Sequence, residues 1–410
     1  MSLKCAYPFL LISVIFSKDA ERKAMRKSVN VYLDNSSTTR AYKDCAELVA
    51  DVMYNSYGNP SSLHRKGIEA EKIVKKAREQ IADTIKVSPG DIYFTSGGTE
   101  SDNLAIIGAC RASRGKHIIS TNIEHPAVLN TLQHLEKRGY IVELMPVAKN
   151  GAVDTEKLAR MIRKDTALLS CMYVNNEIGT VEPVEKIGKI IKAENPYTAF
   201  HVDAVQAYGK IPFTAGQTGA DFISLSSHKI HGPKGVGALY VKNKTKLSPI
   251  IYGGGQQDNV RPGTENVPGI AGFGLAAKMS YDGIAEKAER MNYLKNRLRD
   301  GIVGRLDDVV VNTPTEGAAP HILNISFGYV KSEVLLHSLE ADGIYVSSGS
   351  ACSSHKKGPS YVLTAIGTDK KMIDGSIRFS LSEFTTVEEI DYTIEKVVEN
   401  VKKIRKLLKR

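Results

Sequence analysis

The sequence predicts an α/β protein built on a mostly parallel β-sheet, with a smaller α+β region after it. Six short apolar runs between residues 91 and 227 lack polar–apolar alternation: DIYFTS, HIIST, IVELMPV, ALLSCMYV, AFHVDAV and FISLSS. Strands that are buried on both faces of a parallel sheet have this composition. Most of the runs are separated by segments of helix length, which indicates helices on both faces of the sheet.

Helices are predicted where apolar residues recur on one face. Before the first strand, residues 68–85 carry such a face, which comprises Ile73, Val74, Ala77, Ile81 and Ile85. The segments PAVLNTLQHLEKRG and DTEKLARMIRKD have helix length and lie between predicted strands. We therefore expect them to pack on the central sheet.

The pattern changes near residue 285. A long helical stretch, GIAEKAERMNYLKNRLRDGI, leads to two sparser strands, HILNISF and SIRFSL. We predict a last helix that begins with a capping box between Thr385 and Glu388. Its apolar stripe comprises Val387, Ile390, Ile394, Val397, Val401 and Ile404.

A chain of 410 residues is too long for one ordinary core, so about two domains are expected. We predict a large domain over residues 39–285. A small α+β domain would combine residues 25–38 with residues 286–410. Residues 1–24, which precede Met25, are expected to be an extension of the folded chain.

The distribution of charge and cysteine excludes several classes of protein. The net charge of +10 comes from the tails, +4 in residues 1–30 and +6 in residues 402–410, so a nucleic-acid groove is not expected. The five cysteines are scattered without a C-x-x-C pair, which favours free thiols in a reducing cytoplasm. The apolar run Ala6 to Phe16 is too short to span a bilayer, so no membrane anchor is expected.

Lys229 lies at an unusual place for a lysine. It follows the apolar run FISLSS and precedes HGPKG, which can continue neither a strand nor a helix. A lysine in a turn is ordinarily a surface residue. The residues at the other strand ends decide between that interpretation and a functional one.

Those strand ends also carry reactive or polar groups. Asp203 ends the run AFHVD, and Gln206 follows three residues later. His125 lies in EHPAV after another strand, and Asn175 and Asn176 follow ALLSCMYV. Singly, these residues also fit a helix cap, a packed core histidine and turn asparagines.

A glycine-rich turn completes the set. In FTSGGTESDN, two glycines, Gly97 and Gly98, follow a strand, and Thr99–Glu100 opens a helix whose N-terminus and backbone N–H groups favour an anion. A tight turn with an ordinary N-cap threonine is the alternative. Sites in parallel sheets lie outside the carboxyl ends of the strands, so these groups are expected to meet. Pyridoxal phosphate (PLP) needs a lysine Schiff base, an acid at its ring nitrogen and an anion cradle. The combination therefore predicts PLP as cofactor.

Cys352 differs from the other cysteines in its surroundings. It lies among small polar residues in SSGSACSS and is followed by the cationic segment HKK, whereas Cys110 and Cys171 lie in apolar runs. A loop of this composition favours an exposed thiol that forms a thiolate. The alternative is an inert surface cysteine.

Ten segments together resemble a known family: YLDNSSTT, GNPSSLH, FTSGGTESDNLAI, EHPAV, VNNEIG, HVDAVQ, SSHKIHGPKGVGALY, RPGTENV, SSGSACSS and SIRFSL. In order and spacing they resemble the NifS/IscS-type cysteine desulfurases, from about Val31 to the C-terminus. The resemblance implies a fold-type I PLP-dependent transferase that forms a homodimer. The loop SSGSACSS is similar to that of the group with a long cysteine loop, not to the SufS-like group.

The resemblance implies a role for each candidate residue at the cofactor. Lys229 would bind PLP covalently and move protons, His125 would stack on the ring and shuttle protons, and Asp203 would pair with the ring nitrogen. The other contacts would be Asn176 and Gln206 at the ring hydroxyl or substrate, Gly98, Thr99, Ser226 and His228 at the phosphate, and Thr264 of the partner subunit, also at the phosphate.

It also implies how the substrate reacts. Arg378, in SIRFSL, would hold the carboxylate of L-cysteine in a bidentate fork. Cys352 would attack the substrate sulfur, become a persulfide and leave L-alanine. The sulfur would serve Fe–S cluster or other thio-cofactor assembly through a sulfur-acceptor or scaffold protein. Cys352 would then be a transient ligand of a [2Fe-2S] cluster that is shared with this partner.

Two other functions fit parts of the sequence. Another fold-type I PLP activity, such as that of a selenocysteine lyase or an aminotransferase, would not need the thiol of SGSACSS. A non-catalytic sulfur-assembly scaffold that binds through its basic tail would not need both Lys229 and Cys352.

Overall fold

The structure is a computed structural model, and it describes residues 29–243, 245–348 and 358–408. The predicted extension, residues 1–24, lies outside the described residues. The same holds for Cys352 and its immediate neighbours.

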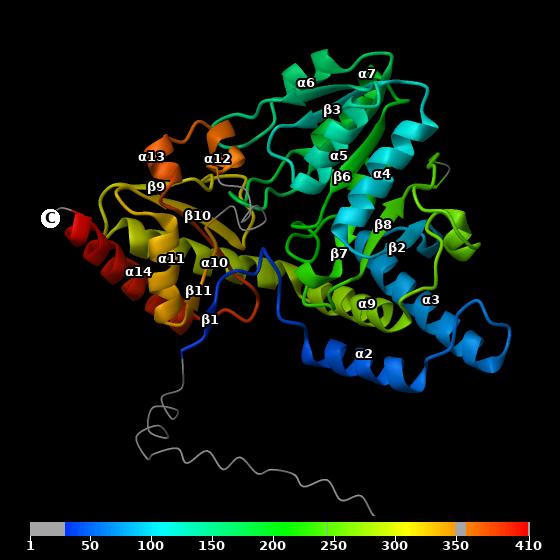
Figure 1. The fold of residues 1–410 in the computed structure, drawn as a ribbon, viewed down its shortest axis with the longest axis horizontal. Coiled ribbons are helices and arrows are strands. Elements are labelled where there is room, and N and C mark those ends of the chain that lie inside the picture. Colours follow the sequence, from blue (N-terminus) through cyan, green and yellow to red (C-terminus); the bar gives the residue numbers. More distant parts are fainter. Residues whose placement is uncertain (1–28, 244, 349–357, 409–410) are drawn as a thin grey trace, which may run out of the picture.

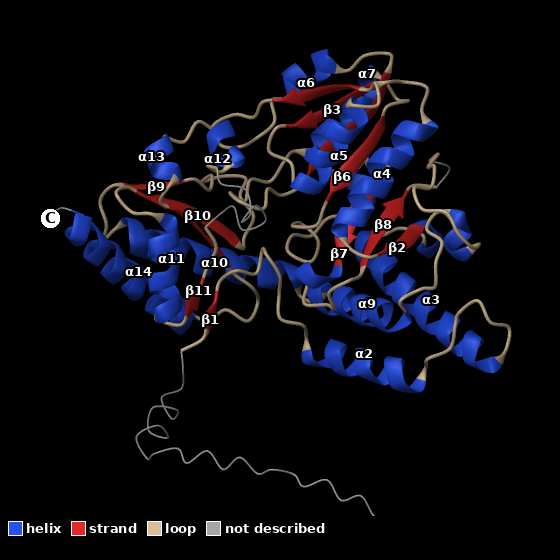
Figure 2. Cartoon of the chain, in the orientation of Figure 1, coloured by secondary structure: helices blue, strands red, loops and turns tan. Residues whose placement is uncertain are grey.

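A seven-stranded sheet forms the centre of the larger part of the chain (Figures 1 and 2). In sheet order its strands are β2 (Ile92–Thr95), β8 (Gly237–Val241), β7 (Phe222–Ser226), β6 (Ala199–Asp203), β5 (Thr166–Met172), β3 (His117–Thr121) and β4 (Ile141–Met145). All neighbours pair in parallel except β8, which is antiparallel to β2 and β7. The mostly parallel sheet and its six predicted strands are confirmed, whereas β8 was not predicted.

Helices cover both faces of this sheet. On one face, Leu168 packs with side chains of α4 (Gly98–Ala112) and α5 (Pro126–Glu136). On the other face, the next residue, Leu169, belongs to the core shared with α2 (Lys43–Asn55), α3 (Arg65–Ile85), α6 (Thr155–Met161), α7 (Val184–Glu194), α8 (Ala215–Thr218) and α9 (Val267–Tyr281). Successive strand residues point to opposite faces, so every buried strand must be apolar throughout.

A separate core lies around a three-stranded antiparallel sheet, on the left in Figure 1. Its strands are β9 (Val309–Val311), β10 (Ile322–Phe327) and β12 (Ser376–Ser380), and a short parallel pair joins β1 (Val31–Tyr32) to β11 (Ile344–Tyr345). The helices α10 (Ile284–Val303), α11 (Ser332–Ala341) and α14 (Val387–Leu408) contribute to this core or pack beside it. The division into domains at residues 25–38, 39–285 and 286–410 stays a prediction.

The start of α14 differs from the prediction by one residue. The backbone N–H of Thr386 donates to Glu389 Oε2 at 2.9 Å, and the N–H of Glu389 donates to Thr386 Oγ1 at 3.2 Å. The capping box is therefore Thr386–Glu389, and the predicted pair Thr385–Glu388 is wrong. Thr385 Oγ1 instead accepts from the N–H of Ser382 at 3.1 Å, which closes the preceding turn.

A small fourth cluster joins the two regions. Val362 and Leu363 of α12 (Tyr361–Ala365) and Ile373 of α13 (Lys370–Ile373) pack against Ile123, Met172 and Ile178, which lie beyond or at strand ends of the large sheet. Across the described ranges, no helix has the length and apolar character that a membrane span requires.

Candidate active site

A cavity of about 250 Å³ lies at the carboxyl ends of the parallel strands. Its lining residues are Ser36, Ser37, Gly98, Thr99, Asp102, His125, Met172, Val174, Asn176, Asp203, Val205, Gln206, Ser226, His228, Lys229 and Arg378. Apart from Thr264 and Cys352, all the site residues predicted from the sequence are in this set. The rule that sites in such sheets lie beyond the strand ends therefore located the cavity.

Lys229 reaches the cavity because strand β7 ends at Ser226 and a single 3₁₀ turn, η2 (Ser227–Lys229), follows it. Its amine donates to the backbone carbonyl of Ser36 at 2.5 Å and to that of Ser37 at 2.9 Å. The side chain is thus directed into the protein by backbone acceptors from the first described segment. It is not the surface lysine that a turn ordinarily carries.

Asp203 is the last residue of β6 and is buried. Its Oδ1 accepts from the N–H of Val205 at 2.9 Å. Burial, and after it the nearby charge of Asp102, raise the pKa of Asp203 to about 7. A cationic ring nitrogen beside this carboxyl would favour its ionised form and offset both effects.

His125 caps the N-terminus of α5 and faces the same cavity. Its Nδ1 accepts from the N–H of Ala127 at 3.1 Å, so the neutral ring carries its proton on Nε2. Burial, and second the charge of Lys229, lower the pKa of His125 to about 4. The imidazole is therefore neutral at pH 7, which suits a ring that stacks on an aromatic ligand.

The part of the cavity wall that Gly98 and Thr99 form has the properties of an anion site. Gly98 and Thr99 form the first turn of the 15-residue helix α4, whose N–H groups and dipole favour negative charge. A Cβ on Gly98 would lie 2.7 Å from Val205 Cγ2, so a larger residue would crowd the cavity. Ser226 and His228 lie at the end of β7 and line the same cavity. His228 Nδ1 is 3.1 Å from Thr38 Oγ1.

Arg378 brings the small sheet into the site. It lies in β12, is almost fully buried and still lines the cavity. Nη1 donates to the carbonyl of Asn176 at 2.8 Å, and Nη2 donates to Asp34 Oδ1 at 2.9 Å and to Ser37 Oγ at 2.7 Å. Its Nε has no hydrogen-bond partner within the described part of the chain, so the guanidinium retains donor capacity for a ligand.

Several polar atoms in the cavity wall have no partner among the described residues: Ser36 Oγ, Asp102 Oδ1, Asn176 Oδ1 and Ser226 Oγ. Buried polar atoms are seldom left without a hydrogen bond, so a ligand with several polar groups is expected here. PLP fits this wall, because the amine, the buried carboxyl, the neutral imidazole and the anion site each match one of its parts.

Comparison with known proteins identifies the family. The model of the family described as Aminotransferase class-V matches residues 31–393. The chain belongs to the class V aminotransferases.

Within the class V aminotransferases, the chain is similar to cysteine desulfurases and NifS-like proteins. The cysteine desulfurase IscS of Dictyoglomus turgidum is 43% identical over 377 residues, which cover 92% of this chain and 95% of the relative. A solved NifS-like protein is 39% identical, with a TM-score of 0.86, and the match covers 91% of this chain and 100% of that one. The structure titled SspA in complex with cysteine is 32% identical, with a TM-score of 0.77 over 87% of this chain and 100% of that one. The chain is thus a NifS/IscS-type member of the class V family, and the fold-type I assignment is confirmed.

The sequence did not distinguish Asn175 from Asn176, whereas the structure gives them different places. Asn176 lines the cavity, whereas Asn175 fixes the turn, because its Oδ1 accepts from the N–H groups of Glu177 and Ile178. Gln206 lines the cavity and donates to the carbonyl of Ser36 at 2.9 Å. Thr264 is exposed on this chain, so its role at the site of a partner subunit stays a prediction.

Asp102 is the functional residue that sequence reasoning missed. It lies one helical turn after Gly98 in α4, so it faces the same strand ends, and only this spacing in GGTESDN could have indicated it. Its Oδ1 is 3.5 Å from Nε2 of the buried His201, and burial raises the pKa of Asp102 to about 7.

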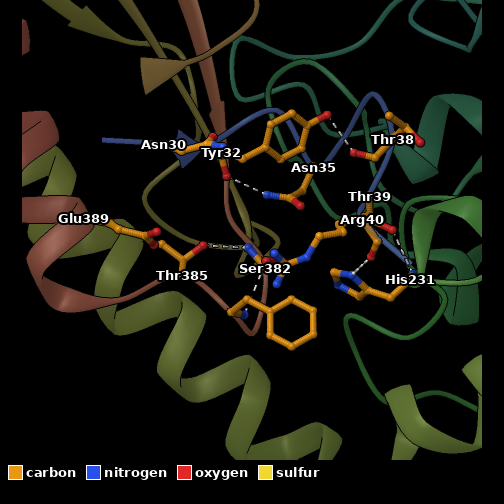
Figure 3. A pocket seen from close by; sticks show the side chains of 11 residues that line it. Asn30, Tyr32, Asn35, Thr38, Thr39, Arg40, His231, Ser382, Thr385 and Glu389 are labelled. Atoms are coloured by element: carbon orange, nitrogen blue, oxygen red, sulfur yellow. Dashed lines mark hydrogen bonds between the residues drawn. The ribbon is translucent and has the colours of Figure 1, made fainter. Parts of the chain in front are cut away.

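A second cavity of about 420 Å³ is lined in part by residues 38–40 of the first described segment (Figure 3). Its lining residues include Thr38, Thr39, Arg40, His231, Phe384 and Thr385. His231 Nδ1 donates to the carbonyl of Arg40 at 2.8 Å, so His231 fixes this segment rather than being a plain turn residue. The strand-end residues gather in the smaller cavity, which is therefore the candidate active site.

Proposed function

We propose that this NifS/IscS-type protein is a PLP-dependent cysteine desulfurase, which converts L-cysteine to L-alanine and retains the sulfur as a persulfide on Cys352. One observation carries the proposal: Lys229, Asp203 and His125 line one buried cavity together with a helix N-terminus and Arg378. The activity of the cysteine desulfurases to which the chain is similar supports it.

Each part of the cavity wall has a task in holding PLP. Lys229 would bind the cofactor covalently, Asp203 would keep the ring nitrogen protonated, and His125 would stack on the ring. Gly98, Thr99, Ser226 and His228 would hold the phosphate, and Gln206 and Asn176 would contact the ring hydroxyl or the substrate. When bound, PLP withdraws electrons from the substrate carbon atoms and so makes the carbon–sulfur bond labile.

Residues of this chain orient the substrate and move its protons. The guanidinium of Arg378 binds the carboxylate of L-cysteine, and its burial strengthens this interaction because the surrounding dielectric is low. The amine of Lys229 would be the acid and base that transfers protons on one side of the substrate. The neutral His125 serves as the second proton carrier.

Sulfur transfer then needs the thiolate of Cys352. Its sulfur attacks the sulfur of the bound cysteine, and a sulfur–sulfur bond forms while the carbon–sulfur bond breaks. The electron pair of the broken bond stays with the substrate carbon, which takes up a proton and becomes the methyl group of L-alanine. The two sulfurs are oxidised to the persulfide level as the carbon is reduced, so no external oxidant is needed.

The wider setting is part of the same proposal. The protein is a homodimer, with Thr264 of the partner subunit at the phosphate, and it passes sulfur to an acceptor or Fe–S scaffold protein in the cytoplasm. Cys352 can share a transient [2Fe-2S] cluster with that scaffold.

The test is the variant Cys352→Ala, purified with PLP and mixed with L-cysteine. We expect formation of L-alanine to fall by about a hundredfold or more, because the nucleophile is gone. The absorbance change that follows cysteine binding should persist, since the cofactor cavity is intact. A second variant, Lys229→Ala, tests the cofactor half of the site. It should lose the visible absorption of lysine-bound PLP.

Full L-alanine formation by Cys352→Ala would refute the persulfide step. Unchanged visible absorption in Lys229→Ala would refute the assignment of the cofactor lysine. The two variants thus test the two halves of the mechanism separately.

A further inference from the structure

We propose that the start of α12, residues 360–363, anchors the segment that carries Cys352 to the wall of the cofactor cavity. We call these residues the α12 anchor, and we infer that Ser360 and Tyr361 are positioning residues for sulfur transfer. The inference rests on the proposed function, because it concerns the step in which the Cys352 thiolate attacks the bound cysteine.

The first contact is made by Ser360, which caps α12. Its hydroxyl donates to Glu177 Oε2 at 2.5 Å, and both side chains are buried. Glu177 directly follows the cavity residue Asn176, and its own N–H is held by Asn175 Oδ1 at 2.9 Å. The hydrogen bond therefore joins α12 to a turn that is already fixed beside the cofactor cavity.

The second contact is made by Tyr361. Its hydroxyl donates to the backbone carbonyl of Glu124 at 2.6 Å, one residue before the cavity residue His125. The carboxylate of Glu124 is buried and accepts from Thr121 Oγ1 at 2.7 Å and from the N–H of Met172 at 3.0 Å. The residue before His125 is therefore held by hydrogen bonds, as is the turn beside Asn176.

Apolar packing holds the α12 anchor between these two contacts. Val362 and Leu363 are fully buried against Ile123, Met172 and Ile178. Met172 also lines the cavity. Burial of two such side chains stabilises the anchor more than a surface contact would. The anchor thus has a core of its own.

The upstream end of the same segment is also attached at the cavity. The N–H of Ser347 donates to the carbonyl of Arg378 at 3.2 Å, and the N–H of Arg378 donates to that of Ser347 at 2.7 Å. Cys352 is five residues after Ser347 and eight residues before Ser360. The described residues on both sides of the Cys352 segment are thus attached beside the cavity. Attachment of a short tether at both ends raises the effective concentration of a reactive group that it carries.

The experiment compares Ser360→Ala, Tyr361→Phe and the double variant in single turnovers of the PLP-loaded protein with L-cysteine. We expect L-alanine formation to slow about tenfold in the single variants and further in the double variant, because a misplaced reactive group loses orientation. The amplitude and cysteine dependence of the absorbance change on substrate binding should stay within about twofold, since neither hydroxyl lines the cavity.

Two matched variants separate positioning from simple loss of a cap. Ser360→Thr retains the hydroxyl and should retain the wild-type rate. Thr214→Ala removes an N-cap of the same kind from the short helix α8, where Thr214 Oγ1 accepts from the N–H of Gln217 at 3.3 Å. It should leave L-alanine formation unchanged, because α8 is far along the chain from the Cys352 segment and does not line the cavity.

The proposal is overturned if the single and double variants form L-alanine at the wild-type rate. It is equally overturned if they lose cysteine binding and L-alanine formation in the same proportion, because the residues would then only stabilise the fold. Tyr361→Phe keeps the test valid if Ser360→Ala does not fold. Cys352→Ala distinguishes the two levels: if it retains L-alanine formation, the persulfide step itself is wrong, whatever the anchor variants do.

Discussion

Two buried carboxyl groups, those of Asp102 and Asp203, share the cofactor cavity. Burial is the first cause of the raised pKa of each, and the charge of Asp102 is the second cause at Asp203, while His201 and Lys229 act in the opposite direction. Two close carboxyls resist carrying a charge at the same time. The charge of Asp102 therefore contributes to the raised pKa of Asp203, the residue that we propose for the ring nitrogen.

This arrangement predicts the effect of Asp102→Asn on PLP binding to cofactor-free protein. Asp203 is ionised above its pKa of about 7, and the ionised form attracts the protonated ring nitrogen, so affinity should rise with pH through that value. Without the charge of Asp102, the pKa of Asp203 falls, and the rise in affinity should move to lower pH. Dissociation constants measured by absorbance between about pH 5.5 and 8 would detect the shift.

Glu182→Gln is a suitable control for this variant. Glu182 is also a buried carboxyl, and burial raises its pKa to about 8, but it does not line the cavity. Its substitution should leave the pH dependence of PLP affinity in place. An unmoved profile in Asp102→Asn would show that the two carboxyls are not coupled.

The residues that could be predicted from sequence share one property. Lys229, Asp203 and His125 all follow predicted strands; each alone also fits an ordinary structural role, and only their combination at one edge of the sheet indicates a site. Asp102 was not identified, because it lies in the second turn of a helix and not directly after a strand end. The acceptors of Lys229 are backbone carbonyls of Ser36 and Ser37, and sequence does not indicate which carbonyls a fold brings together.

At the scale of elements, the N-terminus of α4 determines how closely an anion can approach. Gly98→Ala places a methyl group 2.7 Å from Val205 Cγ2, which must move, and Val205 itself lines the cavity. Overpacking of this kind costs about 1–3 kcal/mol, so we expect PLP to bind about tenfold or more weakly. Titration of cofactor-free protein with PLP measures the loss.

Gly90→Ala provides the comparison for this variant. Gly90 lies in the 3₁₀ helix η1 (Pro89–Asp91), and a Cβ there would meet only Ser88 Oγ, at 3.8 Å. PLP affinity should be unchanged. Wild-type affinity in Gly98→Ala would mean that Val205 relaxes without affecting the cavity.

Elements were predictable where one pattern dominated. The parallel strands could be recognised because both faces are buried and their sequences are continuously apolar. Strand β8 was missed because GVGALYV begins with glycines, which suggested a turn; the structure needs Gly237, since a Cβ there would lie 2.7 Å from the backbone of Gly97. The capping box was displaced because TTVEE offers two threonines and two glutamates at the same spacing, and only the fold selects the second pair.

At the scale of the whole molecule, the predicted dimer makes a specific claim: each site takes Thr264 from the partner subunit. Thr264→Ala should weaken PLP binding in a homodimer, and Lys229→Ala should abolish turnover. In mixed dimers of the two variants, one site would have both Lys229 and Thr264 intact. Activity should therefore return when the two inactive or weakened proteins are refolded together and assayed for L-alanine.

The reverse arrangement gives a different result. If Thr264 served the site of its own chain, every site in the mixed dimer would lack one of the two residues, and mixing would restore nothing. Gel filtration of each variant alone provides the control that both still associate.

The cavity is also closed by residues from the two ends of the described chain. Asp34 bonds Arg378, and Asn35 donates to the carbonyl of Ser380 at 2.9 Å, so the first described segment is held by a strand more than 340 positions later. Synthesis must therefore have passed residue 380 before this pocket can be complete. A nascent chain stalled before residue 378 would be expected to lack full capture of the vitamin-derived coenzyme.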